Sequence, residues 1–165
     1  MRNDKPGKPE KEKPSAYNKA LGLLVRREQS ARELKTKLDR GGYGVDESTT
    51  AIDALQSQQY QSDARFAGSL SRSRAANGYG PRRIFAELKS HGIGDAEISA
   101  AINALDCDWR DLARRQLQRH YGRKPADDAK ERGRRAAFLL RRGFDAATVS
   151  ALTRADIGDP GDEFD

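Results

Sequence analysis

Apolar residues recur every three or four positions along much of the chain, which is the spacing of one face of an α-helix. The clearest stretch predicts three consecutive helices over about 63–77, 81–92 and 95–105. Their apolar positions are Phe66, Ala67 and Leu70, then Ile84, Phe85 and Leu88, then Ile98, Ala101, Ile102 and Leu105. No segment of the sequence predicts a strand.

Capping residues and glycines bound these three predicted helices. Ser62 or Asp63 can cap the first helix, and the Gly78-Tyr79-Gly80 segment ends it. Pro81 suits the first position of the second helix, because that position needs no N–H donor. We expect Asp95 to cap the third helix.

The chain also repeats itself. Residues 30–55 placed over residues 80–105, an offset of 50, match without gaps at nine of 26 positions. A weaker third copy, at an offset of 51, pairs Leu88 with Leu139 and Gly92 with Gly143. The first copy then predicts helices over about 15–28, 30–41 and 46–57, and the third over about 108–121, 126–142 and 145–155.

We therefore predict an all-α protein of three tandem three-helix modules in an elongated, curved arrangement. The modules are expected over 15–60, 61–107 and 108–155. A disordered basic arm is expected over 1–14 and a disordered acidic tail over 156–165. The acidic tail either competes with DNA for a basic face or aids solubility.

Charge points to a polyanionic partner. The 165 residues include 31 Lys and Arg against 25 Asp and Glu. Without the two tails, residues 15–155 carry 26 basic and 17 acidic side chains. A basic body of this kind attracts polyanions, of which nucleic acid is the commonest.

The sequence favours a cytoplasmic protein without metal or cofactor. Cys107 is the single cysteine, so no internal disulfide can form, which fits a reducing compartment. No apolar stretch has the length of a membrane span. Two separated histidines, His91 and His120, do not make a zinc site with one cysteine. We expect a monomer, and no set of residues forms a catalytic constellation.

The central motifs resemble the signature of the RecX family of bacterial RecA regulators. The resemblance covers about 15–155 and is carried by Asp63-Ala-Arg-Phe66-Ala67, Ser71-Arg72-Ser73-Arg74-Ala75, Gly78-Tyr79-Gly80-Pro81-Arg82-Arg83-Ile84, Glu87-Leu88 and Gly92-Ile93. The flanks agree through Leu23-Leu24-Val25-Arg26-Arg27-Glu28, Asp108-Trp109 and Arg141-Arg142-Gly143-Phe144. Thr153 departs from the resemblance, since it stands where an apolar residue is expected.

The resemblance implies a non-enzymatic regulator. Such proteins bind the RecA filament on single-stranded DNA, lie in its helical groove, and suppress its ATPase, strand exchange and co-protease activities. They thereby modulate DNA repair and the SOS response, and they also bind DNA, single-stranded and in some cases double-stranded. The alternative is a general nucleic-acid-binding helical-repeat protein without a dedicated recombinase partner, which would bind DNA with a steep salt dependence.

The candidate contacts to DNA or to the partner are arginines and one tyrosine. Guanidinium groups suit phosphates and carboxylates because their planar donors bind two oxygens at once. The set is Arg72, Arg74, Tyr79, Arg82, Arg83, Arg114, Arg115, Arg134, Arg135, Arg141 and Arg142. Any one of these arginines can instead be an ordinary solvated side chain, but the set as a whole favours a binding surface.

Aromatic and small residues have structural interpretations as well. Tyr79 can stack on a base or on a partner ring, or it can pin two helices together. Phe66, Phe85, Trp109 and Phe138 lie at core spacings, and Trp109 is expected to seal the junction of the second and third modules. Cys107 is interpreted as a small residue near that junction. Gly41-Gly42-Tyr43-Gly44 is interpreted as a repeat turn, because it lacks the remainder of a phosphate-binding loop.

Overall fold

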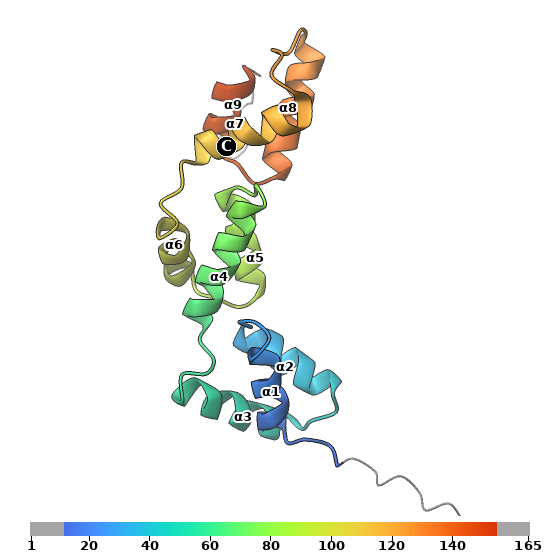
Figure 1. Ribbon diagram of the computed structural model, residues 1–165, viewed down its shortest axis with the longest axis vertical. Coiled ribbons are helices and arrows are strands. Elements are labelled where there is room, and N and C mark those ends of the chain that lie inside the picture. Colours follow the sequence, from blue (N-terminus) through green and yellow to red (C-terminus); the bar gives the residue numbers. More distant parts are fainter. Residues whose placement is uncertain (1–11, 155–165) are drawn as a thin grey trace, which may run out of the picture. The chain divides into compact units, whose positions relative to one another are not determined.

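The computed structural model describes residues 12–154, which form nine α-helices and no strand (Figure 1). The predicted acidic tail and residues 1–11 of the predicted basic arm lie outside the described residues. The helices are α1 (Ala16–Leu24), α2 (Ala31–Arg40), α3 (Val45–Ser57), α4 (Asp63–Ala76), α5 (Pro81–Ser90), α6 (Asp95–Asn103), α7 (Trp109–Tyr121), α8 (Ala129–Arg141) and α9 (Ala146–Thr153).

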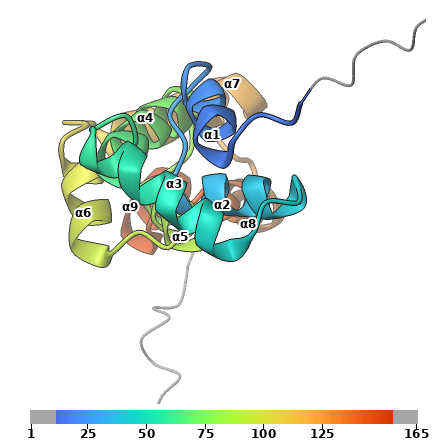
Figure 2. The ribbon, with the colours of Figure 1, turned by 90° about the horizontal axis from the view of Figure 1, so that it is seen from below.

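The helices pack against one another in consecutive groups of three, which confirms the prediction of three tandem modules. In the first, α3 packs on both α1 and α2 (Figure 2). The trios α4–α6 and α7–α9 are built in the same way. The chain divides into two compact units between Gln61 and Ser62, so that the second and third modules belong to one unit.

Side-chain caps define where most helices begin. Ser62 Oγ accepts the N–H of Arg65 at 3.2 Å, so Ser62 rather than Asp63 caps α4. The prediction that Asp95 caps α6 is wrong, because Gly94 occupies the capping position without a side-chain bond. Asp95 is the first residue of α6, where its carboxylate favours the positive end of the helix dipole.

Several helices are shorter than the sequence predicted, among them α8, which covers Ala129–Arg141 instead of 126–142. Helix α1 ends at Leu24, because the Gln29 side-chain amide donates to the Leu23 carbonyl at 2.8 Å and the chain turns there. Helix α6 ends at Asn103, so that Leu105 lies outside the helix on which it was expected.

The same turn follows the second helix of every module. Gly42, Gly92 and Gly143 have φ angles of +76°, +79° and +89°, a conformation that favours glycine. In each case the next residue donates its N–H back to a leucine carbonyl, that of Leu38, Leu88 or Leu139. This regularity confirms the repeat-turn interpretation and the register of the third copy.

The three modules have separate small cores. In the first, Leu34, Leu38, Ile52 and Leu55 are buried, together with Ala16, Ala20 and Ala51. Phe66 and Phe138 are buried in the second and third cores, and Phe85 packs against the second. Trp109 packs against both of these cores, which confirms its predicted place at the junction.

Thr153 is accommodated in the core although it is polar. It is buried, and its hydroxyl donates to the Val149 carbonyl at 2.8 Å within α9. Because the hydroxyl is hydrogen-bonded inside the helix, the departure from an apolar residue costs little.

Candidate partner and nucleic-acid interface

Two glycine turns bring the second and third modules into backbone contact. The Gly80 N–H donates to the Arg142 carbonyl at 2.7 Å, and the Arg82 N–H donates to the Gly143 carbonyl at 3.0 Å. A Cβ atom on Gly80 would lie 2.4 Å from the Gly143 carbonyl oxygen. The two modules therefore dock through their main chains, which leaves no room for side chains at either glycine.

The side chains of Arg142 and Tyr79 add further contacts between the second and third modules. Arg142 Nη1 donates to the Asn77 carbonyl at 3.0 Å, at the carboxyl end of α4, where a cation is favoured. The guanidinium carbons of Arg83 and Arg142 lie 4.9 and 5.2 Å from the centre of the Tyr79 ring. These contacts favour Tyr79 as a residue that pins the modules together, and its stacking on a base or partner ring stays a prediction.

Four of the predicted site residues line one groove, which we call the Tyr79 groove. Its volume is about 770 Å³. The residues that line it are Arg74, Asn77, Tyr79, Arg83, Ala86, Glu87 and Arg142. The fold therefore gathers arginines from α4, α5 and the end of α8 around a single ring.

Arg74 is already engaged within the Tyr79 groove. Its Nε and Nη2 donate to the two carboxylate oxygens of Glu87 at 2.7 and 2.6 Å. The hydrogen bonds from Arg74 lower the pKa of the Glu87 carboxyl and outweigh the opposing effect of burial. Arg74 therefore ties α4 to α5, and its predicted contact with a partner would have to compete with Glu87.

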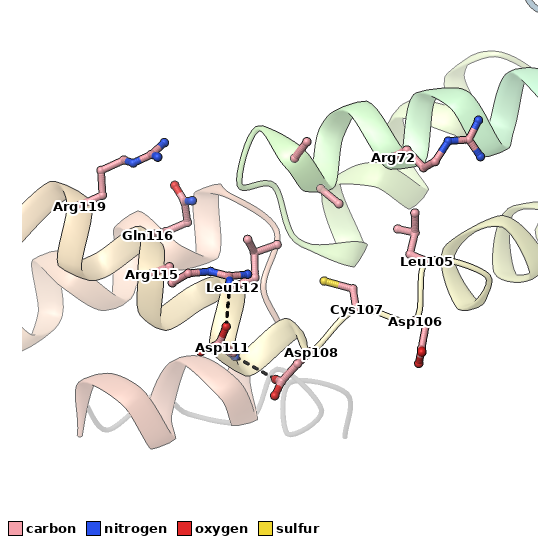
Figure 3. A pocket seen from close by; sticks show the side chains of 12 residues that line it. Arg72, Leu105, Asp106, Cys107, Asp108, Asp111, Leu112, Arg115, Gln116 and Arg119 are labelled. Carbon is pink, nitrogen blue, oxygen red and sulfur yellow. Dashed lines mark hydrogen bonds and ion pairs between the residues drawn. The ribbon is translucent and has the colours of Figure 1, made fainter.

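A second groove lies around Cys107, between α4 and α7, and has a volume of about 610 Å³. Arg72 on α4 and Arg115 and Arg119 on α7 are among the residues that line it (Figure 3). Asp106, Asp108 and Asp111 also line it, so its charges are balanced.

The Cys107 thiol has the character of a packing residue. Burial is the main effect that raises its pKa, which keeps the sulfur protonated and weakly nucleophilic. Cys107 also packs against the core of the third module. Both observations agree with the interpretation of Cys107 as a small residue at the module junction.

Arg135 differs from the other predicted contact residues because it is 9% exposed. Its guanidinium group donates to Glu131 and, at 2.9 Å, to the Lys124 carbonyl. It also lies 5.2 Å from the centre of the Tyr121 ring. Arg135 thus ties the α7–α8 connection to α8, and its contact with a partner stays a prediction.

The remaining predicted arginines are exposed. Arg114 and Arg115 share one carboxylate, that of Asp111, at 3.2 and 3.1 Å. Within residues 12–154, six of the predicted arginines have no ion-pair partner, and these are the exposed Arg72, Arg82, Arg83, Arg134 and Arg141 and the half-buried Arg142. Exposed and unpaired guanidinium groups are the ones most available to phosphates or carboxylates.

Charge is distributed unevenly among the three modules. The net charge of the whole chain does not reveal this difference. Residues 108–155 carry 13 basic and six acidic side chains. Residues 15–60 carry seven and six, and residues 61–107 carry six and five. The positive excess of the body therefore lies mainly in the third module.

The described residues contain neither a metal-binding cluster nor a membrane-spanning helix. Over 12–154, no three His, Cys, Asp or Glu side chains come together in a group that could hold a metal ion. Across the same range, no helix has the length and apolar character needed to cross a membrane.

Comparison with protein-family models identifies all three modules. Residues 16–55 match the first three-helix domain of RecX, residues 62–102 the second, and residues 107–152 the third. A crystal structure of a regulatory protein RecX covers 84% of this chain and 70% of its own, with a TM-score of 0.71 and 22% identity. A crystal structure of RecX from Lactobacillus salivarius covers 84% and 92%, with a TM-score of 0.68 and 21% identity.

Relatives found by sequence comparison are also RecX proteins, and their sequence identity to this chain is higher than that of the two crystal structures. The regulatory protein RecX of Xanthomonas axonopodis pv. citri is 43% identical over 141 residues, which are 86% of this chain and 87% of the relative. That of Stenotrophomonas maltophilia is 41% identical over 141 residues, which are 86% of each chain. The three domain matches and these relatives span the helical modules. The chain therefore belongs to the RecX family of regulatory proteins.

Proposed function

We propose that this protein regulates RecA by binding the RecA filament on single-stranded DNA. The binding suppresses the filament's ATPase, strand exchange and co-protease activities, and so modulates recombinational repair and the SOS response. Family membership supports the choice of partner. The observation that carries the contact surface is the group of exposed arginines without ion-pair partners on the second and third modules.

The predicted site residues fall into two groups under this proposal. The first group is exposed and faces DNA phosphates or acidic side chains of RecA, and its members are Arg72, Arg82, Arg83, Arg114, Arg115, Arg134 and Arg141. Arg74, Arg135, Arg142 and Tyr79 hold helices and modules in place, through Glu87, Lys124, Asn77 and the two arginines beside the ring. The residues of the second group support binding indirectly, because they hold the exposed arginines of the first group in position.

Capture of the protein on immobilised single-stranded DNA, with and without RecA and a slowly hydrolysed ATP analogue, tests the proposal. Binding should be stronger on the RecA-coated strand than on the bare strand at physiological salt. The variant Arg72→Ala/Arg82→Ala/Arg83→Ala should lose most of this gain. The control Arg26→Ala/Arg32→Ala/Arg40→Ala removes the same charge from exposed arginines of the first module and should keep the gain.

General nucleic-acid binding without a recombinase partner is the second candidate function. The 13 basic side chains of residues 108–155 favour it. It predicts that the bare strand captures at least as much protein as the coated strand, and that salt weakens both equally. Such a result would remove RecA from the account while leaving DNA binding in place.

A further inference from the structure

One face of α8 carries basic side chains that the module's packing does not use. Lys130, Arg134 and Arg141 lie at positions i, i+4 and i+11 of the helix. At about 100° per residue these positions fall within about 40° of one another. We call these three residues the α8 stripe. Two buried residues of the helix, Ala136 and Leu139, lie on the opposite face.

The α8 stripe is exposed and electrostatically uncompensated. All three side chains are exposed to solvent. In the part of the chain that the structure describes, none of the three forms an ion pair. The acidic residue of the same helix, Glu131, is instead engaged by Arg135 on the buried side. The stripe therefore presents three unneutralised positive charges over about 17 Å of helix, at 1.5 Å rise per residue.

Comparison of the repeats shows that the fold does not require these charges. At an offset of 51, the positions of Lys130, Arg134 and Arg141 correspond to Tyr79, Arg83 and Ser90 of the second module. In the first module they correspond to Gln29, Glu33 and Arg40. The three modules have the same turn and the same kind of core, although the residues at these three positions differ. The run of three positive charges is therefore particular to the third module.

We propose that the α8 stripe binds the phosphate backbone of single-stranded DNA. The strand is the one that carries the filament, so this inference rests on the proposed function. Basic side chains in a row track a nucleic-acid backbone without reading its sequence. The α7–α8 connection carries two further exposed basic side chains, those of Arg123 and Lys124. The stripe supplies DNA contacts, while the nearly neutral first and second modules are left to face protein.

The salt dependence of DNA binding by the full-length protein tests this inference. Each phosphate contact on a single strand contributes about 0.7 to the slope of log K against log salt. The variant Lys130→Ala/Arg134→Ala/Arg141→Ala should therefore lower that slope by about 2, measured with an oligo(dT) strand between about 50 and 200 mM salt. Its helical circular dichroism should match that of the unaltered protein, since the three side chains are exposed.

Two controls separate local contact from net charge. The variant Arg26→Ala/Arg32→Ala/Arg40→Ala loses the same charge in the first module and should keep the slope. The variant Arg134→Lys/Arg141→Lys keeps the charge of the stripe and should keep the slope as well. An unchanged slope in the stripe variant, or an equal fall in the first-module control, would overturn the inference. RecA takes no part in this measurement, so a failure of the proposed function would appear separately, as intact DNA binding without an effect on the recombinase.

Discussion

Gly80 and Gly143, 63 positions apart in the chain, meet so closely that neither can carry a side chain. A Cβ on Gly80 would lie 2.4 Å from the Gly143 carbonyl oxygen, and a Cβ on Gly143 would lie 2.4 Å from the Arg83 nitrogen. Both clashes are with main-chain atoms, which cannot move aside as a flexible side chain can. The contact couples the second module to the third, and with it the arginines that the two modules carry.

Replacement of Gly80 by alanine should separate the two modules. The added methyl group breaks the bonds from Gly80 to Arg142 and from Arg82 to Gly143, at a cost of about 2 kcal/mol or more. Trp109 is the single tryptophan and packs against both cores, so its fluorescence reports the junction. We expect its emission to shift to longer wavelength in Gly80→Ala and the unfolding temperature to fall.

The matched control is Gly133→Ala. Gly133 lies inside α8, and nothing lies within 4 Å of the position that a Cβ would take. Alanine there should stabilise the protein by about 0.5 to 1 kcal/mol through helix propensity alone, and the Trp109 emission should stay where it is. A Gly80→Ala protein with unchanged emission and stability would contradict the main-chain docking of the two modules.

The Arg74–Glu87 pair predicts a pH dependence of stability. Because the folded protein lowers the pKa of Glu87, the pair stabilises the fold fully above the unfolded carboxyl pKa of about 4.3 and loses its effect as pH falls through the folded value. Glu87→Gln should therefore be less stable than the unaltered protein by about 1 kcal/mol or less at neutral pH. The difference should vanish in acid, as measured by urea unfolding. A difference that persists unchanged in acid would show that the ion pair is not its source.

Two buried hydroxyl groups predict a gain of stability on their removal. Among the described residues, Ser48 Oγ and Ser71 Oγ are buried without a hydrogen-bond partner. A buried hydroxyl that lacks a partner costs about 1 to 3 kcal/mol of desolvation. Ser71→Ala should raise the free energy of unfolding by about 1 kcal/mol, since alanine also favours the helix interior. The exposed Ser73→Ala, on the same helix, should change stability by less. A lower unfolding free energy in Ser71→Ala would show that its hydroxyl is needed.

Local features of the fold were predictable from the sequence because the periodic apolar residues and turn glycines report short-range structure. Leu38, Leu88 and Leu139 mark the same place in the three modules, and the glycine four residues later makes the same turn. The ends of α1 and α6 were less predictable. At α1 a side chain six residues away, that of Gln29, takes the Leu23 carbonyl, which no propensity anticipates.

The candidate site was predictable in its residue types and less so in their partners. The sequence singled out arginines around the Gly78-Tyr79-Gly80 turn, and four predicted residues do line the Tyr79 groove. It could not distinguish Arg74, bound to Glu87, from Arg72 two positions earlier, which is exposed. Nor could it foresee that Arg142 would reach Asn77, because that contact joins residues 65 positions apart. Long-range pairing decides which charges are available to a partner.

We propose that the protein acts on RecA bound to single-stranded DNA. The most direct measurement is DNA-dependent ATP hydrolysis by RecA while this protein is titrated well below one molecule per recombinase. We expect ATP hydrolysis to fall at these low ratios, because a regulator bound to the filament affects many RecA subunits. Hydrolysis that stays constant until the protein is abundant enough to coat the DNA would contradict the claim and leave a general nucleic-acid-binding protein.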